Sequence, residues 1–331
     1  MPLQEQSIRC SRADRLLVNH RNARTSSVAP QARGGRPGAD RRETLTAYAF
    51  LLPGFAFFGL TILWPLVKAF QISFYDWKVL PGIPSPFVGL ENYARALGDP
   101  VFWRALQNSA AYMVLTVPAQ VVLGLLAAVL LNAKMRGLTV FRVLYYLPVV
   151  TSWVVVTLLF QYLFASQSGV INWILRDVLH VTGTNISWFA SRWPAMIALA
   201  ILGVWKGIGW SMIIFLAALQ SVSPELVEAA AIDGAGGFRR FISVTLPAVR
   251  RTATFVTVML VMGGFNVFIS VYLMTGGGPS GETEVLLTYM YRQAFSFLDF
   301  GYGSAIAFLL TGVILVLSLL QWRFLRPGDE Q

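Results

Sequence analysis

Six long apolar stretches constrain what this chain can fold into more than any other feature. They cover about residues 47–74, 109–131, 141–164, 196–219, 253–274 and 304–324. A helix needs roughly 20 predominantly apolar residues to cross a bilayer, and each stretch reaches that length. Because the bilayer core offers no water to unpaired backbone groups, a spanning segment must form its hydrogen bonds internally, as a helix does. We therefore predict an all-α membrane protein with six transmembrane helices.

The composition agrees with a membrane protein and excludes several classes of site. Of the 331 residues, 56% are hydrophobic and 13% are charged, whereas roughly a quarter of a soluble domain is charged. One cysteine, Cys10, and two histidines, His20 and His180, exclude a disulfide framework and a cysteine-based metal site. The six stretches contain no His, Asp or Glu, which disfavours an intramembrane enzyme. We expect neither a catalytic site nor a metal site.

The distribution of basic residues predicts the orientation of the six helices. If the N-terminus is cytosolic, the cytosolic parts carry eighteen of the 26 Lys and Arg residues and the three outer loops carry six. Loops rich in Lys and Arg stay on the cytosolic side of a membrane. We therefore predict that both termini are cytosolic, and that the polar segment 220–252 is cytosolic as well.

The N-terminal tail, residues 1–44, carries nine Arg residues before the first apolar stretch. The tail is too poor in apolar residues to offset its ordering entropy, so we predict that it is disordered. Binding to anionic lipid or nucleic acid is the alternative to a purely topogenic role; we favour the topogenic role and expect no nucleic-acid partner. The transmembrane domain is expected over residues 45–325, followed by a short cytosolic tail, 326–331.

The polar segment between the fourth and fifth stretches has the features of an ordered helix–turn–helix. Residues 223–225, Ser-Pro-Glu, suit a helix start because Ser caps, Pro fits the first position and Glu favours the positive end of the dipole. The helix should extend to about Asp233, where Gly234 ends it. A second short helix is expected over about 238–245, ending before Pro247. A folded segment of this kind is suited to docking another protein.

The spacing of residues in this segment resembles the EAA motif of importer-type ABC transporter permeases. Glu-Ala-Ala is followed after three residues by Gly, and after nine more by a β-branched residue, one residue and Leu-Pro. The resemblance implies that the segment is a coupling loop that docks a cytosolic ATPase, with Glu228 reaching a basic residue of the partner. The residues expected at this docking site are Glu228, Ala229, Ala230, Asp233, Gly234, Val244, Leu246 and Pro247.

The resemblance covers about residues 45–325 and is strongest with the sugar-permease branch, in particular with the first permease of the maltose or glycerol-phosphate type. Further matching segments are 89–93, 204–207, 219–226, 275–279 and 291–295. It implies a multi-pass protein of a bacterial-type plasma (inner) membrane. The implied partners are a second homologous permease subunit, two copies of an ATPase subunit and an extracytoplasmic solute-binding protein. The Arg-rich tail has no counterpart in this pattern.

Polar and aromatic residues inside the apolar stretches are candidates for a substrate pathway, because such residues are costly to expose to lipid. By the resemblance, Gly207 and Trp210 in the fourth stretch would face a translocated sugar. The alternative for Gly207 is close helix packing together with Gly203, in a Gly-x-x-x-Gly pattern. Lys206 lies about ten residues into this stretch and could snorkel, pair with a carboxylate of a partner subunit or contact a polar ligand.

Two further pathway candidates lie in the fifth stretch. The amide of Asn266 can both donate to and accept from hydroxyl groups, and the resemblance places hydrogen-bonding Asn residues here. A hydrogen bond between Asn266 and the second permease is the alternative. Tyr272 is a weaker candidate.

Taken together, the sequence predicts the membrane-spanning permease subunit of an ABC importer for a carbohydrate or polyol. The chain has no Gly-x-x-x-x-Gly-Lys-Ser/Thr sequence, so ATP should be bound by the partner ATPase and no cofactor by this chain. A self-contained, ion-coupled secondary transporter is the alternative. That alternative would use acidic residues near the bilayer midplane, and the six stretches have none.

Overall fold

The computed structural model of the chain describes residues 37–80, 82–133 and 137–325. Most of the predicted disordered tail, 1–44, and all of the predicted C-terminal tail, 326–331, lie outside the described residues. In the described part every regular element is a helix, and one isolated β-bridge joins Tyr75 and Phe87. The described residues divide into two units between Trp64 and Pro65.

The first unit contains the long helix α2 (Pro37–Phe58) and the π-helical turn η1 (Gly59–Leu63). Helix α3 (Trp64–Ile72) starts at the boundary and belongs mainly to the second unit. Most side chains described in α2 and η1 are exposed and apolar. The run Glu43–Ile72 is long and apolar enough to cross a membrane, which is the environment that such a surface requires.

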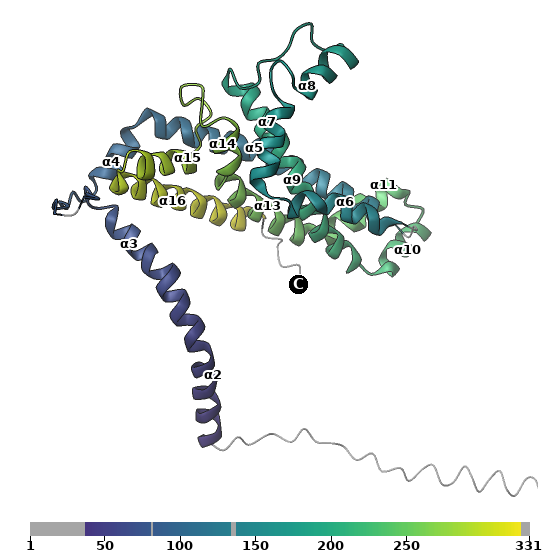
Figure 1. Cartoon of the computed structure of the whole chain (residues 1–331). Coiled ribbons are helices and arrows are strands. Elements are labelled where there is room, and N and C mark those ends of the chain that lie inside the picture. The colour runs from purple at the N-terminus through teal and green to yellow at the C-terminus, as the bar shows by residue number, and fades with distance from the viewer. Residues whose placement is uncertain (1–36, 81, 134–136, 326–331) are drawn as a thin grey trace, which may run out of the picture. The chain divides into compact units, whose positions relative to one another are not determined.

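Four long helices lie side by side in the second unit (Figure 1). These are α5 (Pro100–Leu131), α9 (Arg192–Gln220), α13 (Arg250–Phe265) and α16 (Phe300–Leu325). Helix α5 packs against both α9 and α13, and α13 packs against α16. Three clusters of buried apolar side chains hold these helices together. Helix α5 contributes to all three clusters and is therefore the centre of the bundle.

The third predicted stretch is not one straight helix. It forms α6 (Leu138–Val150) and α7 (Trp153–Leu163), whose axes differ by 95°. Thr151 and Ser152 separate them in extended conformations, with ψ of 149° and 131°. Five described helices or helix runs are long and apolar enough to span a membrane, and the bent pair would be a sixth if it is counted as one span.

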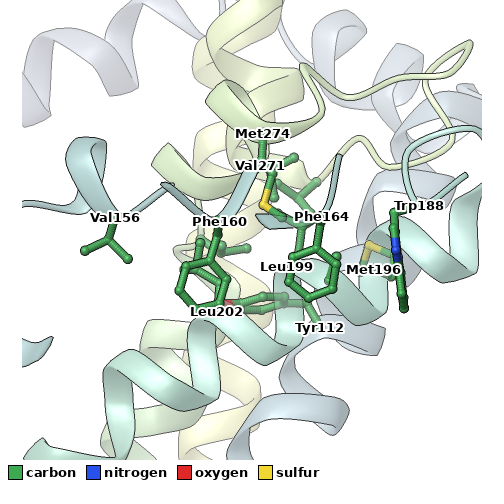
Figure 2. Packing of buried hydrophobic residues seen from close by; sticks show 13 residues of the cluster. Tyr112, Val156, Phe160, Phe164, Trp188, Met196, Leu199, Leu202, Val271 and Met274 are labelled. Atoms are coloured by element: carbon green, nitrogen blue, oxygen red, sulfur yellow. The ribbon is translucent and has the colours of Figure 1, made fainter. Parts of the chain in front are cut away.

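The fifth predicted stretch is also interrupted. Helix α13 ends at Phe265, and α14 (Ile269–Met274) begins after three intervening residues. Helix α14 packs against α7, so the second halves of the two broken stretches contact each other. Their apolar side chains join those of α5 and α9 in one hydrophobic cluster (Figure 2). This cluster includes Tyr112, Phe160, Leu202 and Val271.

Shorter elements connect the long helices. They are α4 (Glu91–Gly98), α8 (Val170–Trp173), η2 (Ile174–Val178), α10 (Pro224–Ile232), α11 (Gly237–Arg240), η3 (Phe241–Thr245), α12 (Leu246–Ala248), α15 (Leu286–Tyr291) and η4 (Arg292–Ser296). Helices α10 and α11 lie at one end of the bundle, and α4 and α15 lie at the other (Figure 1). The two ends therefore carry different structural elements.

Glycines allow the long helices to approach each other closely. A Cβ atom added to Gly209 in α9 would lie 2.1 Å from the backbone oxygen of Tyr145 in α6. A Cβ atom added to Gly124 in α5 would lie 2.5 Å from the Cβ atom of Ser211 in α9. Small residues of this kind let backbones pack closely inside a membrane.

We predict that Gly209→Ala destabilises the protein. The new methyl group meets backbone rather than a flexible side chain, so α6 and α9 must separate, and overpacking of this kind costs about 1–3 kcal/mol. The melting temperature of the detergent-solubilised protein, followed by size-exclusion chromatography after heating, measures the effect. Gly312→Ala in α16 is the matched control, because nothing lies within 4 Å of its added Cβ atom. Equal melting temperatures for the two variants would contradict the prediction.

Candidate functional site

The segment predicted to dock a partner forms the expected first helix and turn. Helix α10 begins at Pro224 after Ser223 and ends at Ile232. Gly234 has a φ of +77°, a left-handed conformation that glycine adopts without penalty. The backbone N–H of Ala235 donates to the oxygen of Ala230 at 3.0 Å, which closes the turn. The predicted helix start at residues 223–225 and the predicted end at Gly234 are therefore confirmed. The predicted cap is wrong, because the side chain of Ser223 makes no capping hydrogen bond.

The second part of the segment differs from the prediction, because helical structure does not end before Pro247. It continues from α11 through the π-helical turn η3 into α12, and then into α13. Pro247 lies in the first turn of α12, where the missing N–H of proline is tolerated. Val249 is fully buried and its N–H donates to Thr245 at 3.1 Å. The segment is thus joined to α13 by a nearly continuous helical path.

The predicted docking residues lie largely on the surface of this segment. Glu228, Ala229, Asp233, Gly234, Leu246 and Pro247 are exposed, and Ala230 and Val244 are half-buried. Among the described residues, none forms an ion pair with Glu228. Ile232 is 87% exposed and Phe238 is 78% exposed. Exposed large apolar side chains, in a segment that also carries an unpaired carboxylate, are typical of a surface that another protein covers.

Three of the predicted pathway residues line one cavity of about 270 Å³. They are Lys206, Gly207 and Trp210 of α9. The cavity is also lined by Tyr112, Thr116, Gln120, Val149, Trp153, Gly203, Met259, Leu260, Gly263 and Gly264. Sequence reasoning missed Gln120 and Thr116, although polar residues four apart in an apolar helix share one face. The cavity thus lies among α5, α6, α7, α9 and α13.

A second cavity of about 470 Å³ shares three residues, Tyr112, Trp153 and Gly263, with the first. Asn266 lines it, and the Asn266 side-chain amide donates to the oxygen of Met262 at 2.8 Å. The second cavity lies at the interruption between α13 and α14, as the first lies beside the interruption between α6 and α7. Both broken stretches therefore contribute to adjoining hollows.

Tyr272 lines neither of these two cavities. It is 47% exposed, and its ring stacks on Phe268 at a centroid distance of 5.2 Å. The structure therefore separates Tyr272 from the other four predicted pathway residues.

The two glycines of the Gly-x-x-x-Gly pattern face polar side chains of α5. A Cβ atom at Gly207 would lie 2.1 Å from Oε1 of Gln120, and one at Gly203 would lie 2.2 Å from the hydroxyl of Tyr112. The amide of Gln120 also donates to the oxygen of Gly203 at 3.2 Å. This geometry favours the close-packing interpretation for both glycines, while the backbone of Gly207 still lines the cavity.

Lys206 is buried, with 4% of the residue exposed. Its Nζ donates to the backbone oxygens of Pro148 and Thr151, both at 2.7 Å, and lies 3.5 Å from that of Val149. It also lies 4.8 Å from the ring centroid of Trp153. The ammonium group is therefore held at the C-terminal end of α6, on the wall of the first cavity.

A polar network joins α4, α5, α15 and α16 at the end of the bundle opposite to α10. Tyr289 and Tyr302 both donate to Oδ2 of Asp99, the latter at 2.7 Å. Arg95 pairs with Asp299 at 2.7 Å, and its guanidinium carbon lies 4.0 Å from the centroid of the Tyr302 ring. Asp299 in turn accepts from the N–H of Tyr302 at 3.1 Å. The network therefore ties four helices together.

The hydrogen bonds of this network shift the pKa values of its members. Burial disfavours the charged form of Asp99, but hydrogen bonds from Tyr289, Tyr302 and the Val101 N–H outweigh it and lower the pKa of Asp99. Burial, together with the hydrogen bond to Asp99, raises the pKa of Tyr289 to about 12. Asp99 is therefore ionised at neutral pH, where it also caps the N-terminus of α5.

An ion pair between a buried carboxylate and a partly exposed arginine holds the loop that precedes α15. Glu284 is 1% exposed and lies 2.8 Å from Nη1 of Arg292. Burial raises the pKa of Glu284, and the charge of Arg292 opposes this rise. Arg292 also donates to the oxygen of Gly276 at 2.7 Å. Asn108 of α5 donates to the oxygens of Glu282 and Glu284, so the loop is tied to α5 as well.

One protein family and several individual proteins match this chain. The family described as "Binding-protein-dependent transport system inner membrane component" matches residues 120–326. The probable ABC transporter permease protein YurN of Bacillus subtilis is 33% identical over 292 residues, which cover 88% of this chain and 99% of YurN. The arabinooligosaccharides transport system permease protein AraP of Halalkalibacterium halodurans is 36% identical over 84% of this chain and 87% of AraP.

A lactose permease and a solved structure are also similar to this chain. The lactose transport system permease protein LacF of Rhizobium radiobacter is 33% identical over 87% of this chain and 96% of LacF. A chain in the crystal structure of a bacterial ABC transporter that imports the acidic polysaccharide alginate matches with a TM-score of 0.75. It is 22% identical, and the match covers 88% of this chain and 98% of that chain. At this identity the structural likeness shows a shared fold.

We predict that Asp99→Asn lowers stability at neutral pH by on the order of 1 kcal/mol, because a neutral amide accepts weaker hydrogen bonds from Tyr289 and Tyr302 than a carboxylate does and carries no charge at the N-terminus of α5. Because the pKa of Asp99 is lowered in the folded protein, its stabilisation is present above the unfolded pKa of about 3.9. The stabilisation is lost as the pH falls through the lower folded pKa. The difference in melting temperature between the wild type and the variant should therefore be largest near pH 7 and shrink below about pH 4.

The control for this prediction is Asp76→Asn, which removes a carboxylate from a surface pair with Lys78 at 2.7 Å. An exposed pair of this kind contributes little to stability. A difference in melting temperature that is independent of pH, or one no larger than that of the control, would contradict the assigned role of Asp99.

Proposed function

Because the chain belongs to the family of binding-protein-dependent transport system inner membrane components, we propose that its cavities form part of the path of a carbohydrate or polyol. As a member of this family it is a permease subunit of an ABC importer, located in the inner membrane. The family is the membrane component of such transporters and not their ATPase. The solute is proposed to be delivered by an extracytoplasmic binding protein.

The walls of the two cavities support a sugar-like ligand. Tyr112, Trp153 and Trp210 supply aromatic faces, which pack against the apolar C–H faces of sugar rings. Gln120 supplies an amide that can both donate to and accept from hydroxyl groups. Relatives are named for the transport of lactose, arabinooligosaccharides and diacetylchitobiose. The aromatic and amide walls at the junction of two broken stretches are the observation that carries this proposal.

The proposed topology counts the bent pair α6–α7 as one span. Six spans then place both termini on one side of the membrane, and the excess of Lys and Arg assigns that side to the cytosol. The segment α10–α12 would face the cytosol, and the network around Asp99 would face outward. The six spans are then five helices or helix runs and one bent pair.

The segment α10–α12 is proposed to dock the cytosolic ATPase. Its exposed Ile232 and Phe238 offer an apolar surface, and Glu228 offers a carboxylate that a basic partner residue can approach. Apolar centres with a few charged contacts are usual at protein interfaces. A second permease subunit would complete the transport path, and two ATPase subunits would bind the two permeases.

The connections of this segment provide a mechanism for coupling. It follows α9 at Gln220 and runs through η3 and α12 into α13. Both α9 and α13 line the first cavity, through residues such as Trp210 and Met259. A movement of the segment, driven by closure of the ATPase dimer, would therefore be transmitted to two walls of the cavity. The transport path would thus change its access when the ATPase binds ATP.

We predict that Glu228→Arg uncouples the chain from its ATPase without removing it from the membrane. Charge reversal places an Arg against a basic partner residue, and such like-charge contacts cost several kcal/mol. Affinity purification of this chain in mild detergent, with mass spectrometry of the co-purifying proteins, measures ATPase recovery. Glu91→Arg in α4 is the control, because Glu91 is also exposed but lies at the opposite end of the bundle.

For the docking assignment, loss of the ATPase in Glu228→Arg and its retention in Glu91→Arg is the expected pair of results. Full ATPase recovery together with normal uptake in Glu228→Arg would refute it. Purification of the wild-type chain alone or only with copies of itself would favour a self-contained secondary transporter instead.

We further predict that Trp210→Ala weakens transport about tenfold, equivalent to ~1.4 kcal/mol, without loss of assembly. The variant removes an aromatic face from the cavity wall. Uptake of the sugar captured by the binding protein, normalised to the amount of assembled transporter, provides the measurement. Trp205→Ala is the matched control on α9, because Trp205 contacts Phe160 at a centroid distance of 5.4 Å and does not line this cavity. Equal uptake by the two variants would assign Trp210 to packing.

A further inference from the structure

The end of α6 lacks the usual features that satisfy a helix C-terminus. The last four carbonyl groups of any α-helix have no partner within the helix, and many helices provide one through a glycine in a left-handed turn. Here the residue after α6 is Thr151, which is extended with φ of −69° and ψ of 149°. No such turn forms. Unpaired carbonyl groups are costly wherever water is excluded.

The Thr151 hydroxyl donates to the oxygen of Pro148 at 2.6 Å, and Lys206 supplies further partners from another helix. Its ammonium group has three donors and lies 2.7 Å from the oxygens of Pro148 and Thr151. These two oxygens lie on either side of the α6 terminus, so a single side chain of α9 holds both edges of the interruption. A positive charge at the C-terminus of a helix is also favoured by the helix dipole.

The interruption determines where Trp153 lies. Trp153 is the first residue of α7, so its position follows directly from the 95° change of direction between α6 and α7. Its ring lies 4.8 Å from Nζ of Lys206 and lines both cavities. Whatever fixes the bend therefore also fixes the aromatic wall that the two cavities share.

We propose that Lys206 is a positioning residue that holds the bend between α6 and α7 and so sets Trp153 in the cavity wall. The proposal deepens the proposed function, because Trp153 matters for transport only if the cavities are the path. Lys206 then acts through the backbone of α6 and α7 and not as a ligand of the solute. Its two shortest hydrogen bonds are already made to main-chain oxygens, and a ligand would have to compete with both.

The distance between two spin labels, one on each side of the bend, tests this directly. Cys10 is the one cysteine of the chain, and Cys10→Ser removes it. Val140→Cys in α6 and Tyr162→Cys in α7 place the labels at sites that are 61% and 62% exposed. At a rise of 1.5 Å per residue, a straight helix would separate these backbone positions by about 33 Å, whereas a right-angled bend gives about 22 Å.

The measurement is pulsed electron paramagnetic resonance on the full chain, purified with its partners and placed in lipid nanodiscs. Lys206→Met removes all donors, Lys206→Arg keeps the charge and the donors, and Lys68→Met removes the other lysine of an apolar stretch. We expect one narrow distribution for the wild type, Lys68→Met and Lys206→Arg. We expect Lys206→Met to shift the mean by up to about 11 Å toward the straight-helix value, or to broaden the distribution at least about twofold.

A narrow, wild-type distribution in Lys206→Met would overturn the proposal. A second result would also overturn it. If Lys206→Met and Lys206→Arg both keep the wild-type distance distribution and both raise the KM for uptake, Lys206 is a solute ligand. If Lys206→Met cannot be purified, Lys206→Gln takes its place, and an unchanged narrow distribution for it would overturn the need for an ammonium group. The distance requires no solute and no transport, so its result is independent of whether the proposed function holds.

Discussion

Inside a bilayer every backbone N–H and C=O group needs a partner within the protein, and this constraint decides where the chain can be interrupted. The long helices α5, α9 and α16 satisfy it mainly with their own backbone hydrogen bonds. The two broken stretches also use side chains: Lys206 reaches the end of α6, and the amide of Asn266 bonds back to Met262 at the end of α13. The interruptions lie beside the two cavities, so irregular backbone is found where the walls of the cavities are formed.

The bundle also separates rigid and adaptable regions. Hydrogen bonds and ion pairs concentrate at the end that holds Asp99 and Arg95, where four helices are tied together. At the opposite end α10 and α11 are exposed and connect α9 to α13 through a short helical path. Apolar packing, as in Figure 2, fills the space between the two ends. A force applied at α10 would therefore be resisted at the far end, and the cavity between them would change shape.

Local patterns in the sequence predicted the straight helices and the start of α10 at Ser223-Pro224, because length, hydrophobicity and the preference of proline for a first helical turn are properties of neighbouring residues. Pro148, inside α6, is a local signal for a kink. The size of the 95° bend was not predicted, since Thr151 and Ser152 carry no strong turn signal and the bend depends on Lys206, far along the chain. The predicted helix end before Pro247 was wrong because proline is accepted in the first turn of α12. Gln120 was missed because its role depends on the facing glycines of α9.

The apolar surface of α10 and α11 is exposed to solvent when no other protein covers it. Ile232 and Phe238 are more than three-quarters exposed, and uncovered apolar groups favour aggregation and recognition by quality-control proteases. We therefore expect a chain made in excess of the protein that is proposed to cover this surface to be degraded before the covered copies. Removal of uncovered subunits would then adjust the stoichiometry of the assembled complex after synthesis.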